Sequence, residues 1–270
     1  MTNLKDKVAV ITGAANGLGK ALAIELYKQS CHLALMDIDF DGLQKLKAEL
    51  QTGEQMITIH RVDISKENEI TSCKEEILRI HHHINIIINN AGVSISRFLE
   101  STNLDDFKWL FNINFWGTVY CTKHFLSELK KQNRSHIVNI ISDFALMGFP
   151  GKTAYASSKS AVMGFTNSLK TELYGSPVYV SLVIPPPLAT GLVLHSKHID
   201  DEKRKMENEF LKKHEMAIEK VAAKIIRKVR KGKYRIVIGK FMFWTDLTTR
   251  LFPTMVHNMI GKNRKKIKFI

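Results

Sequence analysis

Tyr155 and Lys159 are the side chains whose types and spacing best suit catalysis. Four residues apart in a helix, they lie on one face, where a phenol beside an ammonium can transfer a proton to or from a reacting oxygen. A free phenol ionises near pH ~10, so a base working near pH ~7 needs about 4 kcal/mol of added phenolate stabilisation. A neighbouring cation supplies a field of that sign, and we expect Lys159 to lower the pKa of Tyr155. The alternative is a surface pair with no chemical role.

Two further polar residues interrupt apolar segments where a reacting group would need partners. Ser142 directly follows a β-branched run, where parallel sheets place reacting groups, and its hydroxyl can bond a substrate oxygen that gains charge. Asn114 lies inside a long amphipathic stretch although Asn is a mediocre helix former. Its side chain either bonds a buried water and Lys159 or makes a plain buried hydrogen bond.

Three glycines follow the first apolar run, in the segment Thr12 to Gly19. Glycines at a strand-to-helix turn let the backbone approach a pyrophosphate, and the helix N-terminus offers free N–H groups. Asp37 ends the second apolar run, where a carboxylate can bond both ribose hydroxyls and repel a 2′-phosphate. The pattern predicts NAD rather than NADP as the cofactor. The alternatives are a solvated loop carboxylate at Asp37, or Asp39 in its place.

Short β-branched apolar runs alternate with longer amphipathic stretches through most of the chain. Runs that are apolar on both faces are typical of buried parallel strands, with helices between them. We expect strands at 8–12, 33–36, 56–60, 84–88, 137–141, 178–184 and 234–238, and helices at 17–29, 41–50, 66–80, 104–131, 153–173 and 202–229. The order predicts an α/β fold: a single doubly wound Rossmann domain with a seven-stranded parallel sheet over residues 1–240, and a tail at 241–270.

In chain order these motifs resemble the short-chain dehydrogenase/reductase family. The motifs that carry the resemblance are Thr12-Gly13 to Gly19, Asp63-Ile64, Asn89 to Gly92, Asn114, Ser142, Tyr155, Lys159 and Pro185 to Thr190. The resemblance implies that Tyr155 is the acid/base, Ser142 its carbonyl partner and Lys159 a cofactor clamp, and that Asn114 supports a proton-relay water. It implies that the cofactor is bound by Gly13, Asn16, Gly17, Leu18, Gly19, Asp37, Ile38, Asp63, Ile64, Asn90, Ala91, Gly92, Tyr155, Lys159, Ile184, Pro185 and Thr190.

The segment after the sixth expected strand departs from the family. It reads Pro185-Pro186-Pro187 where the family usually has Pro-Gly, and proline removes backbone donors and fixes φ. We therefore expect the loop facing the nicotinamide to be shaped differently, with a substrate lid over residues 190–216. Apolar residues nearby favour an apolar alcohol or ketone over a sugar, with ordinary core packing as the alternative. These are Phe144, Met147, Phe149, Leu192 and Leu194.

Nearly all of the net charge of +14 belongs to the C-terminal quarter. Residues 201–270 hold 20 Lys and Arg against 7 Asp and Glu, whereas residues 1–200 hold 20 against 19. Bulky apolar residues over 241–260 precede a basic cluster at 262–268, a pattern of segments that lie on an anionic membrane surface. Packing on a partner subunit is the alternative, and a nucleic acid is not expected because the aromatics precede the charges.

Cysteine and histidine usage adds two expectations. Three widely spaced cysteines without a C-x-x-C motif indicate a reducing, cytoplasmic location, and the N-terminal residues do not resemble a signal peptide. The run His81-His82-His83 lacks the partners of a metal site, so we expect a helix C-terminus that favours imidazolium and no bound metal.

Together these patterns predict an NAD(H)-dependent oxidoreductase that interconverts a secondary alcohol and a ketone on an apolar small molecule. One alternative is an NADPH-dependent 3-oxoacyl carrier-protein reductase, whose acidic protein partner the basic tail would meet but whose cofactor Asp37 opposes. The other is a dinucleotide-binding sensor or scaffold without chemistry. The resemblance further implies a homodimer or homotetramer built through residues 104–131 and 153–173.

Overall fold

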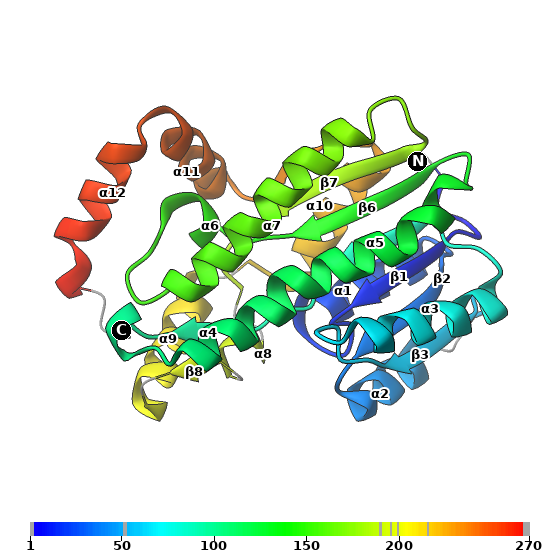
Figure 1. Cartoon of the computed structure of the whole chain (residues 1–270), viewed down its shortest axis with the longest axis horizontal. Helices are drawn as coiled ribbons and strands as arrows, with labels where there is room; N and C mark the ends of the chain where they lie inside the picture. The colour runs from blue at the N-terminus through cyan, green and yellow to red at the C-terminus, as the bar shows by residue number, and fades with distance from the viewer. Residues whose placement is uncertain are drawn as a thin grey trace.

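The computed structural model describes residues 3–50, 53–188, 191–194, 196–198, 200–214 and 216–266. Its main feature is a seven-stranded parallel sheet, as the sequence predicted, and the strand order is β3-β2-β1-β4-β6-β7-β9 (Figure 1). The strands are β1 (Val8–Thr12), β2 (His32–Asp37), β3 (Ile57–Arg61), β4 (Ile86–Asn89), β6 (Ser135–Ile140), β7 (Val178–Ile184) and β9 (Arg235–Val237).

Helices cover both faces of the sheet, so the strands are apolar on both sides. One face carries α1 (Gly17–Lys28), α2 (Phe40–Leu50) and α10 (Ile218–Arg230). The other carries α3 (Glu67–His81), α5 (Gly117–Lys130) and α7 (Thr153–Glu172), which lie in front of the sheet in Figure 1. Successive strand residues alternate between these cores: Ala9 and Ile11 pack with the first set, and Val10 packs with the second.

The long helix expected at 104–131 is present but has a local change of winding. It comprises α4 (Leu104–Phe111), a π-helical turn at Asn112–Trp116 and α5. A π turn inserts one extra residue into the helix, and such turns are frequent at functional sites. It falls around Asn114, the residue that the sequence marked as out of place.

The single helix expected at 202–229 is wrong, because the segment forms two helices, α9 (Asp201–His214) and α10. The apolar side of α10, including Val221 and Ile225, packs beside α1 under the sheet. The apolar residues Phe210 and Leu211 of α9 instead line a cavity at the carboxyl ends of the strands. One straight helix could not pack against α1 and also line this cavity.

Several short elements lie between the strand ends and α9. They are β5 (Ile95–Ser96), a 3₁₀ turn at Leu99–Ser101, α6 (Phe144–Met147), α8 (Gly191–Leu194) and β8 (Lys197–His198). β5 pairs in parallel with β8 to form a second, two-stranded sheet that the sequence did not predict. This small sheet ties the segment before α9 to the body of the domain.

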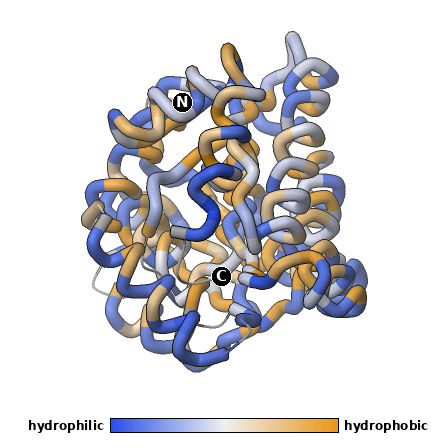
Figure 2. Tube along the Cα trace, turned by 90° about the vertical axis from the view of Figure 1, so that its left-hand side faces the viewer, coloured by the Kyte–Doolittle hydropathy of each residue, from blue (hydrophilic) through white to orange (hydrophobic). Residues whose placement is uncertain are grey.

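The C-terminal segment is helical: α11 (Lys240–Leu251) and α12 (Pro253–Lys262) precede a 3₁₀ turn at Arg264–Lys266. Figure 1 shows α11 and α12 at one end of the molecule beyond α6, and Figure 2 views the molecule from that end. Across the described ranges, no helix combines the length and apolar character needed to span a bilayer.

The histidine run at the end of α3 corrects one expectation. His81 is buried, its Nε2 lies 2.9 Å from the Thr58 hydroxyl, and burial lowers its pKa to about 4. Desolvation therefore outweighs the helix terminus, and the ring is neutral near pH ~7. Among the described residues no group of acidic, cysteine and histidine side chains could hold a metal ion.

Candidate active site

A single cavity of about 1080 Å³ runs along the carboxyl ends of the strands. Parallel α/β sheets bind ligands at this edge. The cavity has a nucleotide end, lined by the loops after β1, β2, β3 and β4, and an apolar end, lined by the loops after β6 and β7 together with α9 and α11. Most of the residues predicted to act on cofactor or substrate line it: Gly13, Asn16, Gly17, Leu18, Asp37, Ile38, Asp63, Ile64, Asn90, Ala91, Gly92, Ser142, Tyr155, Lys159 and Pro185.

The loop after β1 is a tight turn held from the neighbouring strand. Gly13 has φ +66°, a left-handed conformation that favours glycine. The Asn90 side-chain amide donates to the carbonyls of Thr12 and Gly13, both at 3.1 Å. A Cβ on Gly19 would lie 1.9 Å from the Gly13 carbonyl oxygen, so Gly19 lets α1 pack against the loop rather than lining the cavity.

Asp37 fastens this loop to the end of β2. Its Oδ2 accepts from the Ala15 N–H at 2.9 Å and its Oδ1 from the Asp39 N–H at 3.0 Å. Asp39 is turned to its own helix start, where it accepts from Gly42 N–H. Both carboxylates line the cavity, and no Lys or Arg is among the described lining residues of this end.

Tyr155, Ser142 and Lys159 line the cavity together, from the start of α7 and the end of β6. Lys159 is buried, donates to the Ile140 carbonyl at 3.1 Å, and has its pKa lowered to about 8 by burial. Burial raises the pKa of Tyr155 well above its ordinary value, and the neighbouring Ser142 hydroxyl offsets this only in part. In the protein alone, desolvation thus outweighs the expected lowering by Lys159, and the phenol is protonated.

The Asn114 side chain hydrogen-bonds the backbone of Val93 and the side chain of Ser158. Its Oδ1 accepts from the Val93 N–H at 2.8 Å, and its Nδ2 donates to the Val93 carbonyl and to Ser158 Oγ, both at 3.0 Å. The side chain is completely buried, and these bonds match the plain buried hydrogen bond that the sequence left open. Its part in a proton path stays a prediction.

The predicted cofactor residue Ile184 does not line the cavity. Ile184 is buried in the core with Ile141, Val162 and Leu182, so its contribution is to packing behind the cavity wall. Thr190 lies outside the described residues, whereas the prolines before it line the cavity.

The apolar end of the cavity contains the side chains that the sequence proposed and several that it missed. Phe144, Met147, Phe149 and Leu192 line it as expected, while the side chain of Leu194 is not described. The added residues come from α9 and α11: Phe210, Leu211, Phe241 and Met242. Phe210 and Leu211 belong to the segment expected to be a lid, and Phe241 and Met242 to the segment expected to be a tail. Residues far apart in the sequence therefore complete the apolar end of the cavity.

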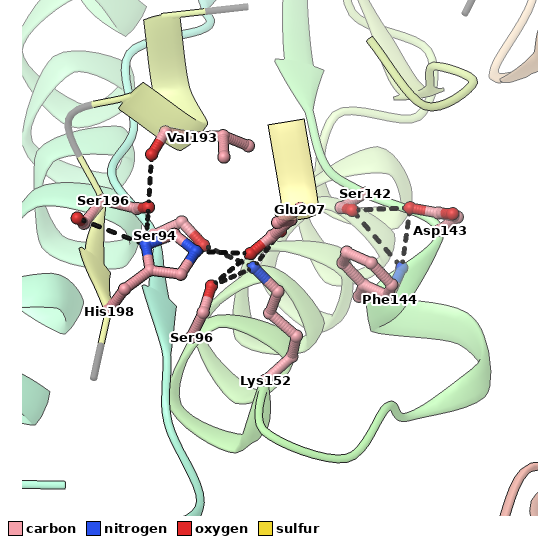
Figure 3. Close-up of polar contacts among 10 residues, drawn as sticks. All are labelled: Ser94, Ser96, Ser142, Asp143, Phe144, Lys152, Val193, Ser196, His198 and Glu207. Carbon is pink, nitrogen blue, oxygen red and sulfur yellow. Dashed lines mark hydrogen bonds and ion pairs between the residues drawn. The ribbon is translucent and has the colours of Figure 1, made fainter. Parts of the chain in front are cut away.

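A buried ionic cluster at this end had no signal in the sequence (Figure 3). Lys152 Nζ contacts Glu207 Oε1 and Ser96 Oγ, both at 2.5 Å, and the side chains of Lys152 and Glu207 are only 2% and 3% exposed. Glu207 Oε2 also accepts from Ser96 and contacts His198 Nε2, both at 2.7 Å. Although burial opposes it, hydrogen bonds from His198 and Lys152 hold the pKa of Glu207 at about 2.

The same cluster joins α9 to the start of α7. Glu207 is on α9, Lys152 directly precedes α7, and Ser96 and His198 are paired neighbours in the β5–β8 sheet. Arg97 adds two hydrogen bonds to the His198 carbonyl, at 3.0 and 2.7 Å. Lys152 stands three residues before Tyr155 in the sequence.

The fold and the cavity define a dinucleotide-dependent oxidoreductase, and comparisons with known proteins place the chain more closely. The profile of the short chain dehydrogenase family matches residues 7–200. "Putative oxidoreductase SadH" of Mycobacterium tuberculosis is 31% identical over 266 residues, 97% of this chain and 96% of that protein. The 3-ketodihydrosphingosine reductase of Mus musculus is 30% identical over 239 residues, 85% of this chain and 70% of that protein.

Among solved structures, a short chain dehydrogenase/reductase from Burkholderia phymatum in complex with NAD aligns with a TM-score of 0.85 and 25% identity. The alignment covers 96% of this chain and 97% of that one. This chain therefore belongs to the short-chain dehydrogenase family of oxidoreductases.

The residues present fit a nicotinamide dinucleotide. A Cβ on Gly13 would lie 2.8 Å from Ala91 Cα, and one on Gly92 would lie 3.2 Å from Lys159 Nζ, so glycine keeps the turn and the path between the two ends clear. The turn, the carboxylate of Asp37 and the ammonium of Lys159 line one continuous cavity. The glycine turn suits the pyrophosphate, the Asp37 carboxylate suits the adenosine ribose, and the Lys159 ammonium suits the nicotinamide ribose.

Proposed function

We propose that the chain is an NAD(H)-dependent oxidoreductase that interconverts a secondary alcohol and a ketone on an apolar small molecule. One observation carries the proposal: the carboxylate of Asp37 and the Tyr155–Ser142–Lys159 set line opposite ends of one cavity whose far wall is apolar. When bound there, a nicotinamide dinucleotide supplies or accepts the hydride.

The side chains of the protein divide the remaining work. Tyr155 holds a proton at its phenol oxygen, gives it to the ketone oxygen in reduction and takes it from the alcohol in oxidation. Ser142 hydrogen-bonds the same substrate oxygen, where charge develops. The Lys159 ammonium favours the phenolate left behind and holds the ribose nearest to the reaction. Because burial keeps the Tyr155 phenol protonated, the protein alone is prepared for proton donation to a ketone.

The cofactor preference rests on Asp37, which lies at the nucleotide end without a described cation beside it in the cavity wall. A 2′-phosphate brought to this carboxylate would meet like charge. We therefore expect tighter binding of NADH than of NADPH. The opposite preference would favour the 3-oxoacyl carrier-protein reductase alternative.

The test is a fluorescence titration with NADH and NADPH, followed by turnover on a panel of steroid, retinoid, aliphatic and acyl-thioester substrates. Tyr155→Phe should lower turnover by about a hundredfold to ten-thousandfold while the dissociation constant of NADH stays within about twofold. Unchanged turnover in this variant would refute the role of Tyr155. Tight NADH binding without turnover on any substrate would support the sensor alternative.

Self-association and a membrane contact complete the proposal. Leu104 and Trp116 are exposed on the α4–α5 helix, which we propose as part of a homodimer or homotetramer interface, with the oligomeric state checked by sedimentation velocity.

For the C-terminal segment we propose contact with an anionic bilayer. Phe241 and Trp244 are 75% and 61% exposed while the charged Asp246 of the same helix is buried against Arg235, an arrangement that turns apolar rings outward beside a basic end.

Liposome flotation tests the membrane contact directly. The full chain should float with anionic vesicles and less with neutral ones, and Phe241→Ser/Trp244→Ser should reduce flotation by about fivefold or more because each ring removed takes apolar area from the bilayer. Equal flotation of the two forms would contradict the proposal, and sedimentation of the same variants shows whether the patch instead joins two copies. The division into a catalytic domain at 1–240, its lid at 190–216 and a surface-binding segment at 241–270 is part of this proposal.

A further inference from the structure

Asp143 is a carboxylate at the reacting end of the cavity that the proposed reaction does not use. It follows Ser142 directly, begins α6 and lines the same cavity as Tyr155. Asp143 is only 7% exposed. A buried carboxylate in an apolar wall costs free energy unless its oxygens are satisfied, so its partners decide what it is for.

One oxygen of Asp143 is occupied by its own turn. Oδ1 accepts from the Ser142 hydroxyl at 2.8 Å and from the Phe144 N–H at 3.0 Å, as Figure 3 shows. Within the described part of the chain, the hydrogen bonds from other residues fall on Oδ1, and the Asp143 backbone N–H adds one further bond to the carboxylate. An ionised carboxylate can accept about four. The carboxylate therefore has acceptor capacity left in the immediate neighbourhood of the serine proposed to hold the substrate oxygen.

The nearby cation is not available to fill that capacity. The Lys152 ammonium directs its protons to Glu207, Ser96 and, at 3.3 Å, Ser94, and these three partners match its three donors. Glu207 in turn is shared with His198. Among the described contacts, the Lys152 ammonium therefore makes no hydrogen bond to Asp143, although the two charges attract each other. Burial raises the pKa of Asp143, and the hydrogen bonds from Ser142, Phe144 and its own N–H, together with the Lys152 charge, oppose this.

We propose that Asp143 is a specificity-determining residue whose carboxylate accepts a hydrogen bond from a hydroxyl or a protonated amine on the carbon next to the reacting carbon. The proposal rests on the proposed function, because Ser142 must hold the reacting oxygen. A donor one bond away from that carbon then lies beside Asp143, while Phe144, Met147 and Leu192 offer only apolar contacts to the rest of the substrate.

The substrate class follows from this placement. It consists of apolar ketones that carry a vicinal hydroxyl or amine, together with the corresponding vicinal diols and amino alcohols. The vicinal group is bound and not altered. Oxidation removes a hydride from the alcohol carbon, which the nicotinamide would accept, and a proton from the alcohol oxygen, which the Tyr155 phenolate would accept, so the hydride and the proton leave by separate routes.

The experiment compares three alcohols of equal chain length with NAD⁺: 2-octanol, octane-1,2-diol and 1-amino-2-octanol. The wild type should show kcat/KM at least about tenfold higher for the diol and the amino alcohol than for 2-octanol, because a site built to bond a polar group discriminates against the analogue without it. Asp143→Leu should bring both ratios to about one. Asp143→Asn, which keeps an acceptor but no charge, should lose the preference for the amine and keep part of that for the diol.

The ratio between substrates is the readout because Asp143 also holds Ser142. Damage to Ser142 lowers kcat/KM for all three alcohols alike and cancels in the ratio. Asp105→Asn, an exposed aspartate on α4, is the matched control and should change nothing. A wild type without preference, or an Asp143→Leu variant that keeps the wild-type ratios, would overturn the proposal.

A binding measurement separates this inference from the proposed function. Calorimetric titration of the three alcohols into the NADH-loaded protein measures their dissociation constants without turnover. Tighter binding of the amino alcohol to the wild type than to Asp143→Asn, without oxidation of any alcohol, would leave the Asp143 site standing and remove the proposed function. Oxidation of all three alcohols, with equal dissociation constants for the wild type and Asp143→Asn, would support the proposed function and contradict the Asp143 site.

Discussion

The two ends of the cavity are built in different ways. At the nucleotide end, neighbouring residues shape the binding surface largely through backbone geometry, as in the Gly13 turn and the Asp37 carboxylate that accepts from Ala15 and Asp39. At the substrate end, buried charges from distant segments meet, with Ser96 and Glu207 separated by 111 residues. The first design consists of backbone turns and partly exposed polar groups, with the Asn90 amide holding the Gly13 turn from 77 residues away. The second depends on every partner being present, since a buried charge that loses its partner has no water to replace it.

The largest expected difference between the two ends is in stability. Lys152→Met leaves Glu207 charged and buried without its main cation, so the free energy of unfolding should fall by about 3–5 kcal/mol. The double variant Lys152→Met/Glu207→Leu removes both charges and should recover most of the loss. Chemical denaturation measures both.

The matched control for that pair is Lys66→Met, which breaks an exposed ion pair with Glu69. An exposed pair contributes little, so this variant should lose no more than about 1 kcal/mol. If Lys152→Met were as mild as Lys66→Met, the substrate end would not depend on its buried charges.

A smaller effect is expected at the nucleotide end from Gly19→Ala. The new Cβ would lie 1.9 Å from the Gly13 carbonyl oxygen, so α1 must move away from the loop. We expect NADH binding to weaken by about tenfold or more, or ~1.4 kcal/mol, with the change in melting temperature smaller than that of Lys152→Met. Gly164→Ala, at a position where a Cβ meets nothing within 4 Å, is the control.

Asp37→Ser tests the charge of the nucleotide end with a similar or smaller effect. Removing the carboxylate removes its repulsion of a 2′-phosphate and one set of ribose acceptors. The ratio of the NADPH to NADH dissociation constants should fall by about tenfold, measured by fluorescence titration. An unchanged ratio would indicate that Asp39, and not Asp37, contacts the ribose.

The smallest effect concerns pH. Glu207 has a folded pKa of about 2 against an ordinary value of 4.5, so its contribution to stability is complete above pH ~4.5 and is lost as the pH falls towards ~2. Between pH 5 and pH 3.5 this group should account for about 1 kcal/mol of the decrease in unfolding free energy. Glu207→Gln should flatten the pH dependence in this interval, and an identical slope in both proteins would contradict the assignment.

Much of the nucleotide end was predictable from the sequence. The strand-to-helix turn with its glycines, the acid at the end of β2 and the number of parallel strands were expected from residues close in the chain and from hydrophobic periodicity, whereas the strand order came from the structure. The placement of Tyr155, Ser142 and Lys159 in one cavity was also expected from their positions at strand and helix ends. Their chemical roles remain predictions that the kinetic experiments address.

The substrate end was less predictable. Glu207 lies in a helix so polar that nothing distinguished it from a solvated residue, yet it is one of the most buried side chains of that helix. The break between α9 and α10 was missed for a related reason, since the helical periodicity continues across it and the two apolar sides differ only in what they pack against. His81 was misjudged because its burial depends on β3 and not on its neighbours in the chain.

The sequence by itself determined the alternation of strands and helices, the glycine turn and the candidate chemistry of Tyr155 and Lys159, because each depends on contacts within a few residues. The tertiary structure alone decided that Lys152, Glu207 and His198 form one hydrogen-bonded cluster and that the Asp143 carboxylate lies in the cavity wall with acceptor capacity left. The physical reason is desolvation. Whether a charged side chain is a surface group or part of a site depends on which distant segments remove its water, and no local pattern in the chain records that.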